Sequence, residues 1–140
     1  MSKSTFEAGL KIREEVLGTA HFERTVKACN EFDQEFHEFV SEYCWGAAWG
    51  RGVLSRDKRS ILNLGMLAAL GRSHEFEIHF RAALLRNEVP LEELREVLIQ
   101  IGVYCGIPAA VESFGIAKKV LAEERIDLSH LQRVTEKKNL

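Results

Sequence analysis

The sequence predicts an all-α protein, a single-domain bundle of about six helices that assembles into an oligomer. Apolar residues recur with the helical period along nearly the whole chain, and no stretch alternates as a strand would. The only two prolines stand where a helix could begin. With 140 residues, 46% of them hydrophobic and 29% charged, the chain can build one core, and disorder or a collagen-like structure is excluded.

The first two helices are expected over residues 5–17 and from residue 21 to about residue 45. Gly18 ends the first, because glycine commonly terminates helices. The second carries an apolar stripe formed by Phe22, Val26, Cys29, Phe36, Val40 and Tyr43. A loop rich in glycine and tryptophan is expected over residues 45–54.

The third and fourth helices follow this loop. Ser55 is a suitable N-cap residue for the third helix. Its segment 61–70 is apolar almost all round, which predicts the central and most buried helix of the bundle. Gly71 ends that helix, and Ser73 caps a fourth helix whose apolar stripe consists of Phe76, His79, Phe80, Ala83 and Leu84.

The last two helices begin near the prolines. Pro90 opens the fifth helix, Gly106 ends it, and Pro108 opens a sixth that runs to about residue 124. The inward residues are Leu94, Val97, Leu98, Ile101 and Tyr104 in the fifth helix and Ala110, Phe114, Ala117 and Leu121 in the sixth. One domain thus covers residues 1–140, with a core over residues 9–121 and a polar tail, expected to fray, over residues 126–140.

The charge balance gives no general attraction for nucleic acid or for an anionic membrane. Nineteen Lys and Arg face 21 Asp and Glu, a net charge of −2, so an anionic ligand needs locally placed cations. The apolar run 61–70 is too short to span a bilayer. The first seven residues lack the apolar core of a signal peptide, so a cytoplasmic protein is expected.

The three cysteines, Cys29, Cys44 and Cys105, are expected to be small core residues. They are odd in number, far apart, and without the spacing of a zinc site. His74 and His79 are five residues apart and cannot bind one ion from one helix face. We therefore expect no metal site.

His79 is the leading candidate for chemistry. It lies on the apolar stripe of the fourth helix, and an imidazole titrates near neutrality. Glu75, one helical turn earlier, is placed to fix its tautomer. The alternative is a core histidine with no chemical role.

Arginines and tryptophans near the predicted loop could form a ligand site. Arg51 and Arg59 could bind a carboxylate in two-pronged fashion, or they could be surface charges paired with acids such as Glu42. Trp45 and Trp49 could wall a pocket, cover the end of the bundle, or contact another subunit.

The chain resembles the carboxymuconolactone decarboxylase family. Matching stretches occur, in the family's order and spacing, at residues 9–18, 42–51, 59–60, 67–72, 79–83, 93–98 and 104–110. The resemblance implies an all-α fold of the alkylhydroperoxidase-D type assembled into trimers or hexamers. It also implies loss of CO2 from 4-carboxymuconolactone, giving 3-oxoadipate enol-lactone, a step in bacterial degradation of aromatic compounds.

This chemistry needs no metal and no organic cofactor, because the lactone carbonyl accepts the electrons. On the resemblance we expect His79 to donate the proton, Arg51 to bind a carboxylate or enolate oxygen, and Glu75 to orient His79. The expected substrate-binding residues are Trp45, Trp49, Arg59, Tyr104 and Glu42. The partner is then a small anionic lactone, with no nucleic acid or membrane involved.

The chain departs from the family pattern at several positions. Val111 stands where asparagine is common, and Gly52 follows the loop arginine where proline is common. The two thiols of the related peroxidases are replaced by Arg72 and Glu75. Two other functions stay open, a thiol-dependent antioxidant relative without CxxC and a non-catalytic binding or scaffold protein.

Overall fold

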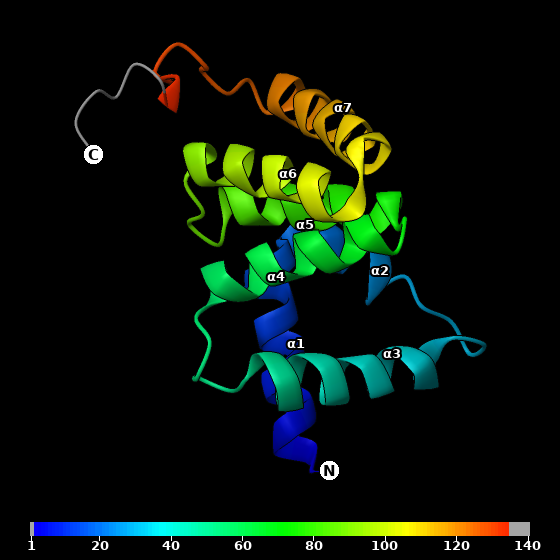
Figure 1. Ribbon diagram of the computed structural model, residues 1–140. Helices are drawn as coiled ribbons and strands as arrows, with labels where there is room; N and C mark the ends of the chain where they lie inside the picture. Colours follow the sequence, from blue (N-terminus) through cyan, green and yellow to red (C-terminus); the bar gives the residue numbers. More distant parts are fainter. Residues whose placement is uncertain (1, 135–140) are drawn as a thin grey trace.

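The computed structural model describes residues 2–134 and is all-α, as the sequence predicts (Figure 1). Within these residues there are seven α-helices and one π-helical segment, and no strand. In chain order they are α1 (Lys3–Leu17), α2 (Thr19–Thr25), α3 (Gln34–Val40), η1 (Ser41–Trp49), α4 (Arg56–Ala69), α5 (Ser73–Leu85), α6 (Leu91–Cys105) and α7 (Ile107–Glu123). No helix in the described part of the chain is long and apolar enough to cross a membrane.

The elements form two unequal parts. Helices α4, α5, α6 and α7 pack on one another and form the core bundle. The continuous helix made of α3 and η1, here called the arm, lies apart from the bundle, and α1 crosses between the two (Figure 1). The arm contacts the rest of the chain mainly through α1.

The most buried helix is α5, not the predicted helix over residues 61–70. Phe76 and Phe80 are each 1% exposed, whereas Leu62 on α4 is 52% exposed and Leu70, directly after α4, is 71% exposed. Helix α5 packs against α4 on one side and α7 on another. Although α4 is apolar on most of its surface, one chain has too few helices to cover all of its faces.

The glycines and prolines end and begin helices where the sequence predicts. Gly18 and Gly106 follow α1 and α6 with φ of 95° and 100°, a conformation that L side chains rarely adopt. Pro90 directly precedes α6, and Pro108 lies in the first turn of α7. Helix α5 begins at Ser73 itself, so this serine is not its N-cap residue.

The predicted second helix, from residue 21 to about residue 45, is not continuous. Helix α2 ends at Thr25, and a turn precedes α3. In this turn the Asn30 N–H donates to Asp33 Oδ1 at 2.8 Å, and the Phe32 N–H donates to Asn30 Oδ1 at 2.9 Å. Such side-chain acceptors compete with helical hydrogen bonds. The predicted apolar stripe is therefore wrong in part, and Phe36 is 64% exposed.

The predicted loop over residues 45–54 begins too early, because residues 45–49 belong to η1. Gly9 and Gly46 allow the backbones of α1 and η1 to cross at close distance. A Cβ on Gly9 of α1 would lie 1.8 Å from the Ser41 carbonyl oxygen, and one on Gly46 would lie 2.3 Å from the Thr5 carbonyl oxygen. Only glycine permits backbones to approach so closely.

The cysteines are not core residues, contrary to expectation. Cys29 is half-buried, and Cys44 and Cys105 are exposed free thiols. Cys44 lies on the arm, close enough to Arg13 of α1 to interact with it electrostatically, and Cys105 lies at the end of α6.

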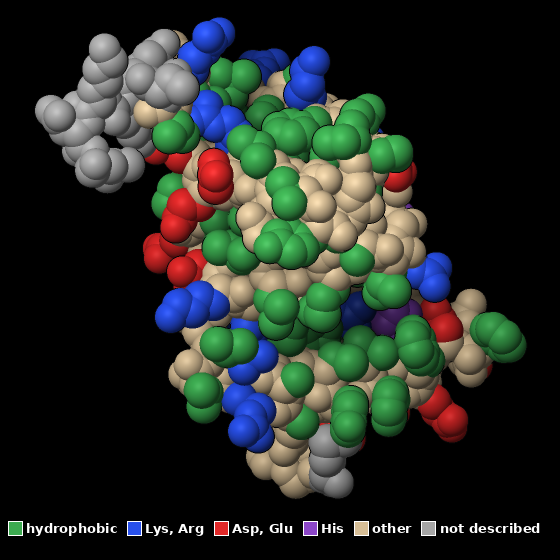
Figure 2. All heavy atoms as spheres, in the orientation of Figure 1, with side chains coloured by type: hydrophobic (Ala, Val, Ile, Leu, Met, Phe, Trp, Pro, Cys, Tyr) green, Lys and Arg blue, Asp and Glu red, His purple; other side chains and the backbone are tan. Residues whose placement is uncertain are grey.

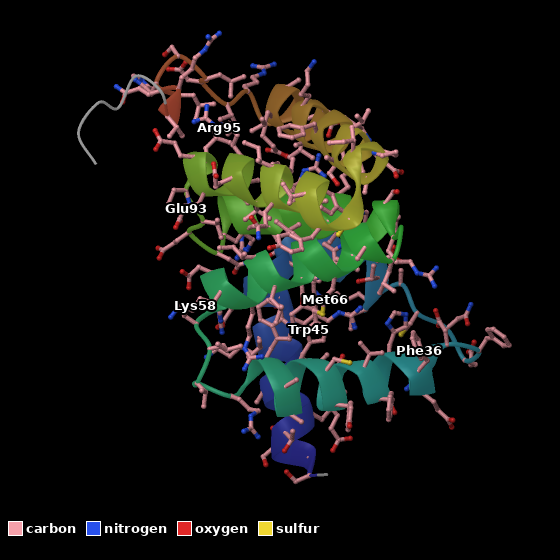
Figure 3. All side chains as sticks on the ribbon, in the orientation of Figure 1. Phe36, Trp45, Lys58, Met66, Glu93 and Arg95 are labelled. Atoms are coloured by element: carbon pink, nitrogen blue, oxygen red, sulfur yellow. The ribbon has the colours of Figure 1, made fainter. Side chains whose placement is uncertain are left out.

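The described part of the polar tail folds back onto the bundle. Arg95 of α6 donates from Nη2 to the Gln132 carbonyl oxygen at 2.6 Å (Figure 3). Leu128 and Leu131 share a small apolar cavity with Phe80 and other core residues. The rest of the predicted tail, residues 135–140, lies outside the described residues.

Candidate active site

A hollow separates the arm from the core bundle. In Figure 2 it lies between α3 below and the bundle above, is edged by hydrophobic side chains, and shows Lys or Arg and His atoms within it. Trp45 of the arm and Met66 of α4 extend into the space between the two parts (Figure 3).

His79 lies half-buried on α5 and is neutral at pH 7. Burial lowers the pKa of its imidazole to about 4, and the charge of the nearby His21 lowers this pKa as well. Glu75, one turn earlier on α5, acts in the opposite direction. Glu75 thus interacts electrostatically with His79, and its predicted role in orienting the imidazole stays a prediction.

His21 is a second histidine of this site, which the sequence analysis missed. Burial lowers its pKa first, and the positive charge of Arg13 lowers it further. His21 reaches this position because α2 starts immediately after the turn at Gly18, which redirects the chain. The helical period gives no sign of a contact between α2 and α5.

Arg13 is the second group of the candidate site, after His21, that the sequence analysis did not single out. It is only 7% exposed. Its Nη1 donates to Ser41 Oγ at the long distance of 3.5 Å, and its Nε has no hydrogen-bond partner. Burial lowers the pKa of the guanidinium. The helical period could have found it, because Arg13 shares the buried face of α1 with Gly9 and Val16.

The two predicted tryptophans lie together on η1. Their ring centroids are 5.0 Å apart, and Trp45 is 6% exposed. They lie on the segment that packs against α1. Their predicted role as a pocket wall stays a prediction.

Arg51 and Arg59 lie together at the N-terminal end of α4. Arg59 Nη2 donates to the Arg51 carbonyl oxygen at 3.1 Å. The Arg51 side chain is exposed, whereas the buried Nε of Arg59 lacks a partner. Figure 1 places the loop before α4 at the end of that helix opposite to α2.

Glu42 and Tyr104 are not grouped with His79 in one chain. Glu42 lines a separate cleft of about 390 Å³ with Lys3, Phe6 and Glu38. Tyr104 is 79% exposed on α6. Glu42 or Tyr104 could act in the site only if a second subunit brought it next to His79.

The described residues contain no cluster of three or more His, Cys, Asp or Glu side chains placed to hold a metal ion. The electrostatic contacts of the structure link a neutral histidine, His79, to a second histidine, His21, and link His21 to the buried guanidinium of Arg13. Guanidinium and imidazole groups are residue types that can bind an anion and transfer a proton.

Residues 34–119 match the model of the carboxymuconolactone decarboxylase family. The chain belongs to this family, which confirms the resemblance seen in the sequence.

Two curated relatives are decarboxylases. The chain is 36% identical over 118 residues to a 4-carboxymuconolactone decarboxylase of Acinetobacter baylyi, which covers 84% of this chain and 87% of that protein. It is 30% identical over 133 residues to a nitrosuccinic acid decarboxylase of Metarhizium robertsii, covering 95% and 92%. Both relatives support a carboxy-lyase activity for this chain.

Proposed function

We propose that the protein is a cofactor-independent decarboxylase of a small dianion, 4-carboxymuconolactone or a related lactone or carboxylic acid. The observation that carries this proposal is the half-buried, neutral His79, which interacts with His21, while His21 in turn interacts with the buried Arg13. The family relationship supports the reaction class.

The proposed reaction breaks the bond between a ring carbon and its carboxylate. The electron pair of this bond moves through the ring double bond to the lactone carbonyl oxygen, and CO2 leaves. A proton then adds to the ring carbon next to the carbonyl, which restores the C=O bond. The protein must therefore hold the dianion, stabilise the enolate oxygen and deliver one proton.

His79 is the proposed proton donor. Burial keeps the His79 imidazole neutral. A neutral imidazole does not carry the additional proton that the ring carbon needs. A bound dianion favours the protonated imidazole, because opposite charges close together raise the pKa of a base. When the substrate binds, His79 therefore takes up a proton from solvent, and Glu75 stabilises the resulting imidazolium.

The remaining roles follow the expectations from the sequence. Trp45 and Trp49 exclude water from the hollow, and Arg51 and Arg59 attract the anion to its entrance. The exposed positions of Arg51 and Tyr104 suit a site that a neighbouring subunit completes.

The named substrates of the two relatives share one chemical feature. In nitrosuccinic acid the carboxylate sits on the carbon that bears the nitro group, and in 4-carboxymuconolactone it sits on a carbon conjugated to a carbonyl. In both, an electron-withdrawing group accepts the electrons that CO2 leaves behind. This feature defines the substrate class that we propose.

An assay with both compounds tests the function. Enzymatically generated 4-carboxymuconolactone and nitrosuccinate are supplied separately, and CO2 release is followed. We expect turnover of one of them, and a loss of at least a hundredfold in kcat for His79→Gln. His130→Gln, an exposed tail histidine, serves as the control and retains activity.

The outcomes separate the two claims. A folded wild-type protein that releases CO2 from neither compound contradicts the proposed substrate class. Full activity of His79→Gln contradicts the proton-donor role and leaves the decarboxylase function standing.

We also infer that the functional unit is an oligomer, in keeping with the trimer or hexamer that the family resemblance implies. Large apolar side chains stand exposed on α4, α6 and α7, among them Leu70 at 71%, Val103 at 71% and Val111 at 66%. Contiguous apolar surface of this kind marks interfaces. Light scattering that gives the mass of one chain, 15.9 kDa, would contradict this inference.

A further inference from the structure

Arg13 differs in its burial from the other arginines whose contacts the structure shows, including Arg59, whose Nε also lacks a partner. Arg81 is paired with three glutamates, and Arg56 with Glu15 at 2.8 Å. Those arginines lie at or near the surface. Arg13 is the most buried of them, and no carboxylate within residues 2–134 pairs with it.

The hydrogen bonds of Arg13 are also incomplete. A guanidinium has five N–H donors in a planar fork. One of them reaches Ser41 Oγ at the long distance of 3.5 Å, and the buried Nε reaches no acceptor. A buried charge without a partner is costly, so proteins retain it where an anion binds.

The surroundings of Arg13 show where such an anion would lie. The charge of Arg13 acts on His21, and that of His21 on His79. The three side chains come from α1, α2 and α5, three helices that the turn at Gly18 and the packing of α1 on α5 bring together. An anion held by Arg13 would therefore be within the electrostatic reach of both histidines.

We propose that Arg13, with Ser41 beside it, is the residue that binds a carboxylate of the substrate in the hollow. This assignment rests on the proposed function and moves the anchor from Arg51, which the sequence suggested, to α1. The planar guanidinium of Arg13 presents its Nε–H and an Nη–H in the geometry that suits the two oxygens of a carboxylate.

The two arginines then have different tasks. Arg51 is exposed, and water screens an exposed charge, so its contribution is to attraction rather than to tight binding. Arg13 binds where water is largely excluded, and there an ion pair with hydrogen bonds is strongest. The bound carboxylate neutralises Arg13, which removes one cause of the low pKa of His21.

Binding of succinate, a four-carbon dianion that lacks an electron-accepting group and is not decarboxylated, tests the proposal without catalysis. Calorimetry measures succinate affinity for the wild type, Arg13→Lys, Arg13→Met and Arg51→Met. We expect Arg13→Met to weaken binding at least tenfold, equivalent to about 1.4 kcal/mol. Arg13→Lys keeps the charge but loses the fork and should weaken binding less, and Arg51→Met should weaken it least.

A second readout uses the unaltered protein, because a variant of a buried arginine can fail to fold. With 15N-labelled arginine, the Nε–H signal of Arg13, identified by its loss in Arg13→Lys, should shift on addition of succinate. Circular dichroism establishes which variants are folded.

Three results would overturn the proposal. They are a wild type that does not bind millimolar succinate, a folded Arg13→Met that binds it as the wild type does, and an Arg13 Nε–H signal that succinate leaves unchanged. If succinate binds weakly and only Arg51→Met loses this binding, Arg51 and not Arg13 is the residue that binds the carboxylate. Each result leaves the CO2-release assay to decide the decarboxylase function separately.

Discussion

The core bundle and the arm are held in place in different ways. In the bundle, large side chains are enclosed, and Phe76, Phe80, Leu94 and Leu98 are each at most 1% exposed. In the arm the aromatic residues of α3 and early η1 stand open, with Phe36, Phe39 and Tyr43 all more than half exposed. The bundle is held by buried apolar side chains, and the arm by the close backbone contact of η1 with α1.

This difference explains where the site lies. A part that packed as tightly as the bundle would leave no room between α5 and its neighbours. Because the arm touches the rest mainly through α1, a hollow remains, and polar side chains of α1 and α2 can face it. The stable part fixes His79, and the arm encloses the space in front of it.

The largest effect expected from this comparison is on stability. Phe80→Ala in the bundle should lower the free energy of unfolding by about 3–5 kcal/mol, because it removes an enclosed ring and leaves a cavity. Phe36→Ala in the arm should change it by no more than about 0.5 kcal/mol. Urea unfolding at a fixed protein concentration measures both. An equally large loss for Phe36→Ala would show that another molecule covers the arm.

A pH effect of intermediate size should come from His79. Its pKa is about 4 in the folded protein and near 6.5 in the unfolded chain. Between these values the unfolded state binds a proton that the folded state does not, so stability is full above pH 6.5 and falls as the pH drops towards 4. The loss should reach about 3 kcal/mol at most.

Urea unfolding at a series of pH values, compared with His79→Gln, isolates this contribution. The variant lacks the titrating imidazole, so its stability should fall less steeply between pH 6.5 and 4. Parallel curves for the two proteins would mean that His79 is solvated and that the hollow is wet.

The smallest effect concerns the crossing that holds the arm. Gly9→Ala places a methyl group against the Ser41 carbonyl oxygen and should cost about 1–3 kcal/mol. Both tryptophans of the chain lie on η1, so their fluorescence reports on the arm directly and should change.

Gly65→Ala on α4 is the matched control, because a methyl group there meets no atom within 4 Å. It should stabilise the protein by up to about 1 kcal/mol, since alanine favours helix over glycine. Unchanged tryptophan fluorescence in Gly9→Ala would contradict the close crossing.

The predicted elements are most accurate where local signals are strong. Gly18 and Gly106 end helices, and Pro90 precedes one, because their backbone preferences act within a few residues. The prediction is wrong around residues 26–33, where the side chains of Asn30 and Asp33 form a turn inside an apparent helical stripe. It also places the most buried helix at α4 instead of α5, because composition cannot tell which apolar face finds a partner.

The candidate site could be predicted only in part. His79 and Glu75 lie one turn apart on a single helix, so spacing alone relates them. His21 and Arg13 come from other helices, and the contact between those helices and α5 depends on how the chain turns at Gly18. Arg51 and Tyr104 were selected by residue type and resemblance, and their exposure within one chain is a property that the sequence does not contain.

The sequence by itself determined the all-α class, most helix ends and the family, because the helical period, glycine, proline and ordered motifs act locally or along the chain. Only the tertiary structure decided that a separate arm exists, that α5 is the enclosed helix, and that a buried guanidinium interacts with His21, which in turn interacts with His79. The physical reason is that burial and charge interactions depend on distances between helices, and these are fixed by the packing of distant segments, such as Gly9 against Ser41.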